Sequence, residues 1–303
     1  MRTNRFLGQL VGALTRDTPA FAPTHLHGSG FGKNLITAVA RNGPAFSPPN
    51  TPDEMGRNMR RCNLDDADLT DADFTHADFS RAKLTRAKLT RANLTRANLT
   101  RAYLVDAHLV EANLTRADLT DAKLTGADLR CADFTDAKLT RANLNGADLT
   151  RAWLADADLT GADLTGADLT GADLTAANLT AANLTRAWLT GEIKPPYTSR
   201  ANLTRADLAH AKLTDADLTD ADLTRAWLTN ADLSGANLTQ ANFTDADLSG
   251  ANLSDADFGA TAQIERLAGA RWNSATIWPA QHAAEICAAS DELPDGTFRV
   301  RNG

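Results

Sequence analysis

Several residue types are scarce in this 303-residue chain, and their scarcity excludes whole classes of protein. It has two tyrosines and three cysteines, and no two cysteines form a C-x-x-C pair. An odd, unclustered set of cysteines argues against a disulfide framework and favours a reducing compartment. No stretch approaches the ~18 consecutive apolar residues of a membrane span. We therefore expect a cytoplasmic protein that does not contact the membrane.

The N-terminus is only superficially like a signal peptide. Arg2 and Arg5 precede the apolar stretch FLGQLVGAL, and an A-x-A sequence follows at Ala20. Gln9 interrupts the apolar stretch, and Arg16 lies between it and that site. These departures favour a cytoplasmic location over secretion.

Residues that commonly carry chemistry are scattered. None of the six histidines has the spacing to a cysteine or to another histidine that a metal site requires. The carboxylates are many, but they recur at regular intervals, whereas catalytic carboxylates need a cleft that perturbs their pKa. The sequence therefore predicts no enzyme activity, no metal and no cofactor.

What the chain has in abundance is a repeat of five residues. The pattern A-x-[LF]-[TS]-x runs from Cys62 to Gly191 for about 26 units and resumes from Ala201 to Ala260 for about 12 more. A helix is excluded, because five residues rotate each leucine by about 140° and leave no apolar stripe. A flat strand is excluded too, because a period of five puts every second leucine on the opposite face. A short extended piece followed by a bend fits, and it predicts a coil with leucine and alanine inside.

The stretch ADLTGADLTGADLTGADL, from Ala157 to Leu174, resembles the pentapeptide-repeat proteins. The resemblance implies an all-β fold, a right-handed quadrilateral β-solenoid with one pentapeptide per side and four per coil. Residues 20 apart then stack, and charges at the corner position alternate in sign along rows such as Asp66–Arg86–Asp106 and Arg101–Asp121–Arg141. Such exposed pairs contribute only about 0–1 kcal/mol each, and charges kept simply for solubility explain them equally well.

Five segments follow from this pattern. They are a basic, proline-rich and mostly disordered leader (1–61), a solenoid (62–191), a loop that leaves the coil (192–200), a continued solenoid (201–260) and a C-terminal cap and tail (261–303). Within the leader we expect a short amphipathic helix over Phe6 to Leu14. In an alternative interpretation, native translation starts at Met55 or Met59.

The segments outside the repeat carry their own signals. The interruption EIKPPYTSR contains Pro195 and Pro196, which donate no N–H to a ladder, so we expect an excursion, either functional or merely tolerated. In the tail, Trp272, Ile277 and Trp278 are bulky enough to cover the last leucines. A short helix is predicted over residues 280–290 and a last strand in GTFRVRN.

Negative charge gathers toward the C-terminal end of the repeat. Residues 201–260 contain ten aspartates against Arg205, Lys212 and Arg225, whereas residues 1–61 carry eight Arg and Lys against three Asp and Glu. The acidic coils therefore bear a net charge roughly every 2 Å, close to the one per ~1.7 Å of duplex DNA. A rod of that charge density is suited to a basic DNA-binding surface.

The family resemblance implies a partner of this kind. Qnr quinolone-resistance proteins and the self-resistance factors of topoisomerase-poison producers resemble DNA and bind type II topoisomerases, which implies DNA gyrase or topoisomerase IV here. It also implies a homodimer through the C-terminal segment and no direct nucleic acid binding. The candidate partner-binding residues are Asp207, Asp215, Asp217, Asp220, Asp222 and Asp232 in the coils and Lys194, Pro195, Pro196 and Tyr197 in the interruption.

Two other functions remain open. A scaffold without DNA mimicry would bind through aromatic residues placed where water is expected, namely Tyr103, Trp153, Trp188 or Trp227. Ice binding would use threonine rows on flat faces, but aspartate and arginine interleave those faces. The first of these is the main alternative to topoisomerase binding.

Overall fold

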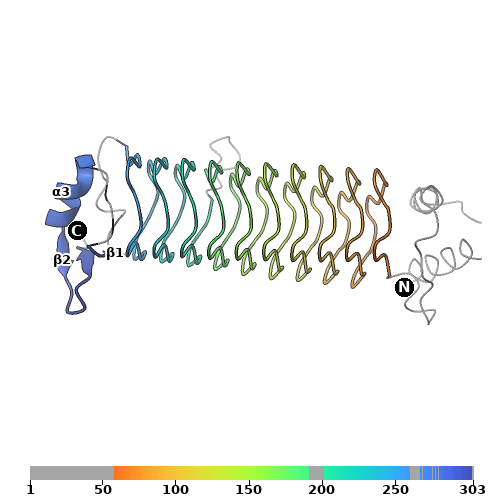
Figure 1. The fold of residues 1–303 in the computed structure, drawn as a ribbon, viewed down its shortest axis with the longest axis horizontal. Coiled ribbons are helices and arrows are strands. Elements are labelled where there is room, and N and C mark those ends of the chain that lie inside the picture. Colours follow the sequence, from red (N-terminus) through yellow and green to blue (C-terminus); the bar gives the residue numbers. More distant parts are fainter. Residues whose placement is uncertain are drawn as a thin grey trace, which may run out of the picture.

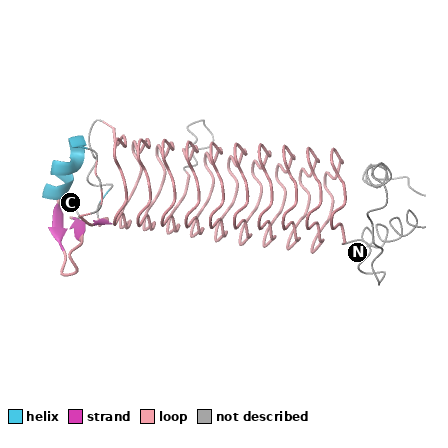
Figure 2. Cartoon of the chain, viewed as in Figure 1, coloured by secondary structure: helices cyan, strands magenta, loops and turns pink. Residues whose placement is uncertain are grey.

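The chain winds into a column of stacked coils with a small cap at its C-terminal end (Figure 1). This computed structural model describes residues 58–190, 201–259, 267, 269–274, 276, 278 and 280–301. The coils consist of turns and loops because each one touches its neighbours through single-residue β-bridges rather than long strands (Figure 2). The predicted leader, with its helix over Phe6 to Leu14, lies outside the described residues apart from its last positions.

Parallel bridges join residues that are 20 apart in the sequence, the length of four five-residue units. They form four ladders, which we name first, second, third and fourth after their starting residues Asn58, Asn63, Asp68 and Asp73. The earliest bridge, from Asn58 to Asp78, lies ahead of the predicted start of the solenoid at Cys62. The repeat region is thus a β-solenoid in which every ladder residue meets its equivalents one coil away.

The same backbone hydrogen bonds recur in every unit. Leu84 donates its N–H to the carbonyl of Tyr103 in the next coil at 2.7 Å, and Lys83 donates back to Cys62 at 2.8 Å. A third bond closes the bend inside the unit, from the N–H of Ala87 to the carbonyl of Leu84 at 3.0 Å. These bonds satisfy the backbone without long strands, which is why an extended piece of about three residues suffices per side.

Leucine and alanine fill the interior of the column. Leu144 is 0% exposed and Ala142 1%, and the same burial holds for their equivalents in each coil. Burying a leucine side chain contributes about 1.5–3 kcal/mol, so the column of leucines holds the coils together. At the N-terminal end Phe74 and Phe79 replace leucine and pack edge to face at 4.9 Å.

Between successive ladders the backbone turns a corner in the left-handed conformation. Non-glycine corner residues such as Arg86 (φ 54°) and Asp71 (φ 58°) adopt it, as do corner glycines such as Gly161 (φ 63°). Residues with a Cβ rarely adopt this backbone conformation, and they do so singly where packing and hydrogen bonds around them hold the backbone in it. Here each corner N–H bonds the next coil, as from Arg86 to Val105 at 2.9 Å.

The ladders continue from one side of the interruption to the other. Residues 191–200 lie outside the described part, but the bridges on either side continue from Asp173 to Asn202 and from Trp188 to Asp217. These partners are 29 residues apart, nine more than elsewhere. The nine residues of the interruption therefore add nothing to the repeat register.

A cap closes the C-terminal end (Figure 1). It comprises β1 (Arg271–Trp272), α3 (Ala280–Ala288), β2 (Ser290–Glu292) and β3 (Phe298–Val300). The strands form an antiparallel sheet in the order β1-β3-β2, and Arg271 also bridges Asp247, so the sheet continues the first ladder. The predicted short helix and last strand are confirmed as α3 and β3.

Aromatic side chains join the cap to the last coils. Trp272 stacks on Phe298 at 4.4 Å and meets Trp278 edge to face at 5.9 Å. Phe258 of the last coil lies 6.4 Å from Trp278, ring centre to ring centre. Trp272 and Trp278 are buried as predicted, whereas Ile277 lies outside the described residues. No helix in the described ranges is both long and apolar enough to cross a membrane.

Candidate functional site: an acidic edge

Side chains on the ladders shape the bends as well as the surface. An Asp or Asn on a ladder accepts a hydrogen bond from the backbone N–H two residues later, as Asp217 does from Thr219 at 3.0 Å. The threonine hydroxyl donates to the same Oδ1 at 2.6 Å. Asx turns of this kind are a standard way to bend a chain. Ladder aspartates therefore have a structural role that sequence reasoning missed, although the recurring D/N-L-T triplet was its signal.

Corner charges of the N-terminal coils pair across neighbouring coils. Arg86 contacts Asp66 at 2.8 Å, Arg91 contacts Asp71 at 2.7 Å, and Asp121 accepts from Arg141 at 2.8 Å. The hydrogen bond from Arg91 lowers the pKa of Asp71, which is evidence that this pairing favours the charged form. In these coils, positive and negative corner charges largely cancel.

The structure brings four of the predicted partner-binding residues together. Asp215, Asp217, Asp220 and Asp222 follow one another around one coil, over a corner, the third ladder, the next corner and the fourth ladder. Asp215 is exposed and the other three are half-buried. All four nevertheless reach the surface of the same coil.

Asp207 and Asp232 are not part of that group. Asp207 lies on the first ladder and Asp232 on the second, so both face away from the corner between the third and fourth ladders. Burial alone would raise the pKa of Asp232, but hydrogen bonds from Ser234, Thr214 and Asn252 outweigh it and lower the pKa. Lys194, Pro195, Pro196 and Tyr197 lie outside the described residues.

The acidic coil pairs with the described residues that flank the interruption. Asp217 bridges Trp188, which lies three residues before the gap in the described chain, and Asp222 bridges Asn202, which lies just after it. Asp220 occupies the corner between these two ladders. The ends of the interruption and the acidic group therefore meet on one edge of the column, which the sequence alone did not indicate.

Within residues 157–259, we use the name acidic edge for the corner between the third and fourth ladders together with the two ladders that flank it. Its charged members are Asp168, Asp173, Asp217, Asp220, Asp222 and Asp257. Over the described residues of this span every Lys and Arg lies elsewhere, and these are Arg186, Arg205, Lys212 and Arg225. Negative charge is thus segregated from positive charge on this side of the rod.

Exposed aromatic residues do not form a patch. Tyr103 is 45% exposed, Trp153 61%, Trp188 56% and Trp227 55%. They belong respectively to the second, fourth, third and first ladders, so no two of them stack on one ladder. Singly exposed aromatic residues are common on protein surfaces. A scaffold that binds through a shared aromatic surface gains no support from this arrangement.

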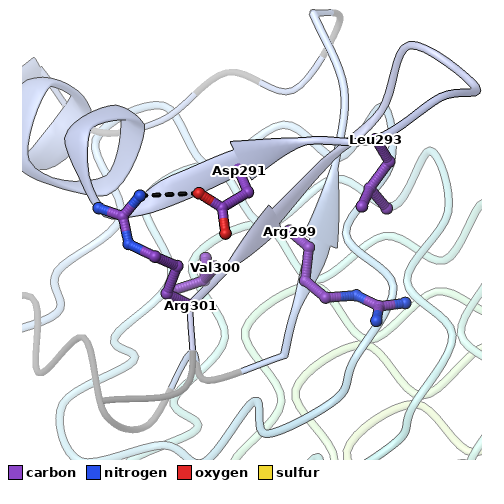
Figure 3. Close-up of a pocket in the computed structure, with 5 residues that line it drawn as sticks. All are labelled: Asp291, Leu293, Arg299, Val300 and Arg301. Carbon is purple, nitrogen blue, oxygen red and sulfur yellow. Dashed lines mark hydrogen bonds and ion pairs between the residues drawn. The ribbon is translucent and has the colours of Figure 1, made fainter.

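Within the described ranges nothing resembles a metal centre, since no group of three or more His, Cys, Asp or Glu side chains is placed to hold an ion. A shallow hollow of about 440 Å³ lies on the cap, lined by Asp291, Leu293, Arg299, Val300 and Arg301 (Figure 3). Arg301 pairs with Asp291 there at 2.9 Å.

Burial raises the pKa of the Cys62 thiol to about 11, which marks Cys62 as an interior filler rather than a nucleophile.

Comparison with known proteins agrees with this geometry. The family described as pentapeptide repeats matches in 8 copies, over residues 58–91, 92–130, 117–154, 157–191, 201–240 and 221–259. The chain belongs to the pentapeptide-repeat family. Such proteins form right-handed β-solenoids and are generally structural or interaction proteins rather than enzymes. No curated protein sequence matches the chain.

Solved pentapeptide-repeat structures are similar over much of the chain. HetL, involved in heterocyst differentiation regulation in the cyanobacterium Nostoc sp. strain PCC 7120, is 32% identical, with 79% of this chain and 92% of HetL covered and a TM-score of 0.36. QnrB1, a plasmid-mediated fluoroquinolone resistance protein, is 16% identical, with 65% of this chain and 94% of QnrB1 covered and a TM-score of 0.45. These likenesses concern the repeat fold.

Proposed function

We propose that this pentapeptide-repeat protein uses its acidic edge to bind the basic DNA-binding surface of a type II topoisomerase, DNA gyrase or topoisomerase IV. The observation that carries the proposal is the segregation of charge, since the edge holds six aspartates and none of the cations of residues 157–259 that the structure describes. The class of partner is the one that the sequence resemblance implies. Binding in place of DNA would protect the enzyme from drugs or toxins that act on its DNA complex.

The proposal takes each coil as four-sided and right-handed, with one pentapeptide and one ladder per side. Four ladders at a step of 20 residues support this geometry. The acidic edge is then a convex corner that runs along the rod, as a phosphate backbone does. The nine-residue interruption leaves the column at this corner and contributes Lys194, Pro195, Pro196 and Tyr197 to the contact.

Salt and DNA provide the first test. Affinity for the purified topoisomerase, measured by surface plasmon resonance, should fall steeply with ionic strength because exposed charges lose reach as the Debye length shortens to about 8 Å. Duplex DNA should compete for the same surface. A complex that is insensitive to salt, or that persists at saturating DNA, would favour a scaffold without DNA mimicry.

Two triple variants locate the contact. Changing Asp168, Asp217 and Asp222 to Asn removes three charges from the acidic edge and keeps the side-chain oxygen that accepts from the backbone at residues 170, 219 and 224. The matched control changes Asp207, Asp232 and Asp247, on the first and second ladders, to Asn. The first variant should weaken binding at least tenfold and the control far less. Equal losses would show that only net charge matters.

A further inference from the structure

The N-terminal coils carry a predominantly positive edge on the opposite side of the column, with Asp78 and Asp118 on the first ladder that flanks it. The corner between the first and second ladders holds Arg61, Arg81 and Arg101 in successive coils, and the second ladder beside it holds Lys83 and Lys123. All five side chains are exposed. We call these five residues the basic edge.

Charge on the basic edge differs from that of the corner between the second and third ladders. That corner alternates in sign and forms an ion pair between Arg86 and Asp66, whereas the corner between the fourth and first ladders also stacks two arginines, Arg96 and Arg116. On the basic edge only Arg101 has an ion pair among the described residues, with Asp121 at 3.3 Å. Like charges directly opposite each other across a ladder or corner repel. A stack of three arginines is therefore a surface whose repulsion an external anion would relieve.

The basic and acidic edges point in opposite directions. The four ladders follow one another around each coil, so the corner between the first and second is separated by two ladders, either way, from the corner between the third and fourth. The edges also lie at different heights, with centres about six coils apart, roughly 28 Å at the spacing of β-strands. A second copy in the same orientation, shifted sideways and along the axis, would bring its acidic edge against the basic edge of the first.

The repeat matches the spacing of the charges on the two edges. Both edges belong to the same column, so their charged side chains recur at multiples of one pitch, about 4.8 Å. Arg61, Arg81 and Arg101 of one copy can therefore face carboxylates of a second copy whenever the two copies are displaced along the axis by a whole number of coils. We propose that the chain associates with a second copy of itself through contact between the basic edge of one copy and the acidic edge of the other.

This contact is heterologous and does not close on itself. A pair of copies keeps one free edge of each sign, so assemblies should grow with concentration and dissolve at high salt. The inference goes beyond topoisomerase binding and is tested with the chain alone, so that failure of either leaves the other standing.

Three double variants of the full chain isolate the contact. Arg81→Asp with Lys83→Asp replaces two of the five cations of the basic edge with carboxylates, and Asp217→Lys with Asp220→Arg replaces two of the six aspartates of the acidic edge with cations, so each variant removes most of the net charge of one edge. Asp207→Lys with Asp255→Arg is the matched control, with the same charge change on a ladder and a corner outside both edges. Every substitution uses a residue type that the repeat already places at such positions.

Sedimentation velocity at about one-tenth and about twice physiological salt provides the readout. The wild type and the control should exceed the monomer mass at low salt, with an average mass that rises with concentration, and return to monomer at high salt. Each edge variant alone should stay monomeric. Their equimolar mixture should associate again, because the unaltered acidic edge of the first variant can meet the unaltered basic edge of the second.

Several results would overturn the proposal. They are a monomeric wild type at low salt, edge variants that associate like the wild type, or a mixture that stays monomeric. A monomeric wild type that binds a single-stranded oligonucleotide, lost in the Arg81→Asp, Lys83→Asp variant, would assign the basic edge to nucleic acid instead.

Discussion

At the residue scale, the positions of the five-residue unit have different structural roles. Alanine and leucine are buried, the ladder residue bends the chain through its side-chain oxygen, and the corner residue adopts positive φ. Charge varies mostly at the ladder and corner positions, with Asp65 and Arg130 as charged residues at the position after leucine. Function is therefore encoded mostly at the ladder and corner positions, which is why the surface differs so much along a uniform column.

Leu144→Asp should be among the most damaging substitutions. Leu144 is 0% exposed, with equivalent leucines one coil away on either side, so an aspartate there has no partner for its charge. We expect a loss of more than about 4 kcal/mol in the free energy of unfolding.

The control is Arg141→Ala at an exposed corner, where Ala176 and Ala181 show that alanine tolerates the same φ. It loses one exposed ion pair with Asp121, so we expect only a small change in the free energy of unfolding. Urea denaturation of both variants checks the contrast. Equal shifts in the midpoint would mean that the assignment of leucine to the interior is wrong.

Asp158→Ala tests the turn-forming role of the ladder position. Asp158 accepts from the N–H of Thr160 at 3.0 Å, from its hydroxyl at 2.6 Å and from the hydroxyl of Thr140 at 2.9 Å. Alanine removes these acceptors and should cost about 1–2 kcal/mol, whereas Asn keeps Oδ1 and should cost less than about 0.5 kcal/mol. Thermal denaturation at neutral pH compares the two. If Asn proved as destabilising as Ala, the charge of Asp158 would matter more than its hydrogen bonds.

The buried positions and the presence of a bend in each unit were predictable from the sequence, and the left-handed conformation of the corner residues was not. A period of five places Ala and Leu two residues apart on one face, so the pattern alone identifies the residues of the interior. Left-handed backbone at Arg86 or Asp71 has no such signal, because these residue types rarely adopt positive φ on their own. It arises from the hydrogen bonds between coils, which depend on the completed stack.

At the element scale, the interruption and the cap show how the ladders continue past segments that lack the five-residue pattern. The ladders pass from Trp188 to Asp217 with nine extra residues between them. The cap continues the first ladder through Arg271 and then covers the last coil with aromatic rings. Its helix and last strand were predictable from local sequence, whereas the sheet order β1-β3-β2 depends on contacts between segments far apart in the chain.

Deleting residues 192–200 should leave the column intact. The deletion joins Gly191 to Ala201 and restores the pattern A-x-L-T-x without a shift, so that Asp173 and Asn202 become 20 residues apart like the bridged pairs of the preceding coils. We expect a thermal midpoint within a few degrees of the wild type, measured by circular dichroism. A large drop would show that the interruption packs against the coils and stabilises them.

At the scale of the whole molecule, a uniform interior supports a surface that changes along and around the rod. Paired charges dominate the N-terminal coils, the basic edge lies on one side of them, and the acidic edge lies on the other side farther along. The sequence showed the trend in charge along the chain. It did not show that Asp207 and Asp232 face away from Asp217, because that depends on the number of units per coil.

The number of units per coil can be tested through disulfide formation. Cys131 is an exposed corner residue, and Arg151 is its equivalent one coil later. A spacing of about 4.8 Å between coils lies within the Cα–Cα range of about 4.4–6.8 Å for disulfides. In a chain that also carries Cys287→Ser, the variant Arg151→Cys should therefore form a disulfide with Cys131 on mild oxidation, detected by mass and by gel mobility without reductant.

Inserting one pentapeptide should move the disulfide to a different residue. A second copy of residues 137–141 keeps the five-residue pattern but turns everything after it by one side of the coil. Gly146 then replaces Arg151 as the residue stacked on Cys131, so Gly146→Cys should crosslink in the lengthened chain and Arg151→Cys should not. Crosslinking of Arg151→Cys in both chains would contradict the 20-residue register. The same insertion turns the acidic edge by one ladder relative to the basic edge, so their opposition depends on the count of pentapeptides between them.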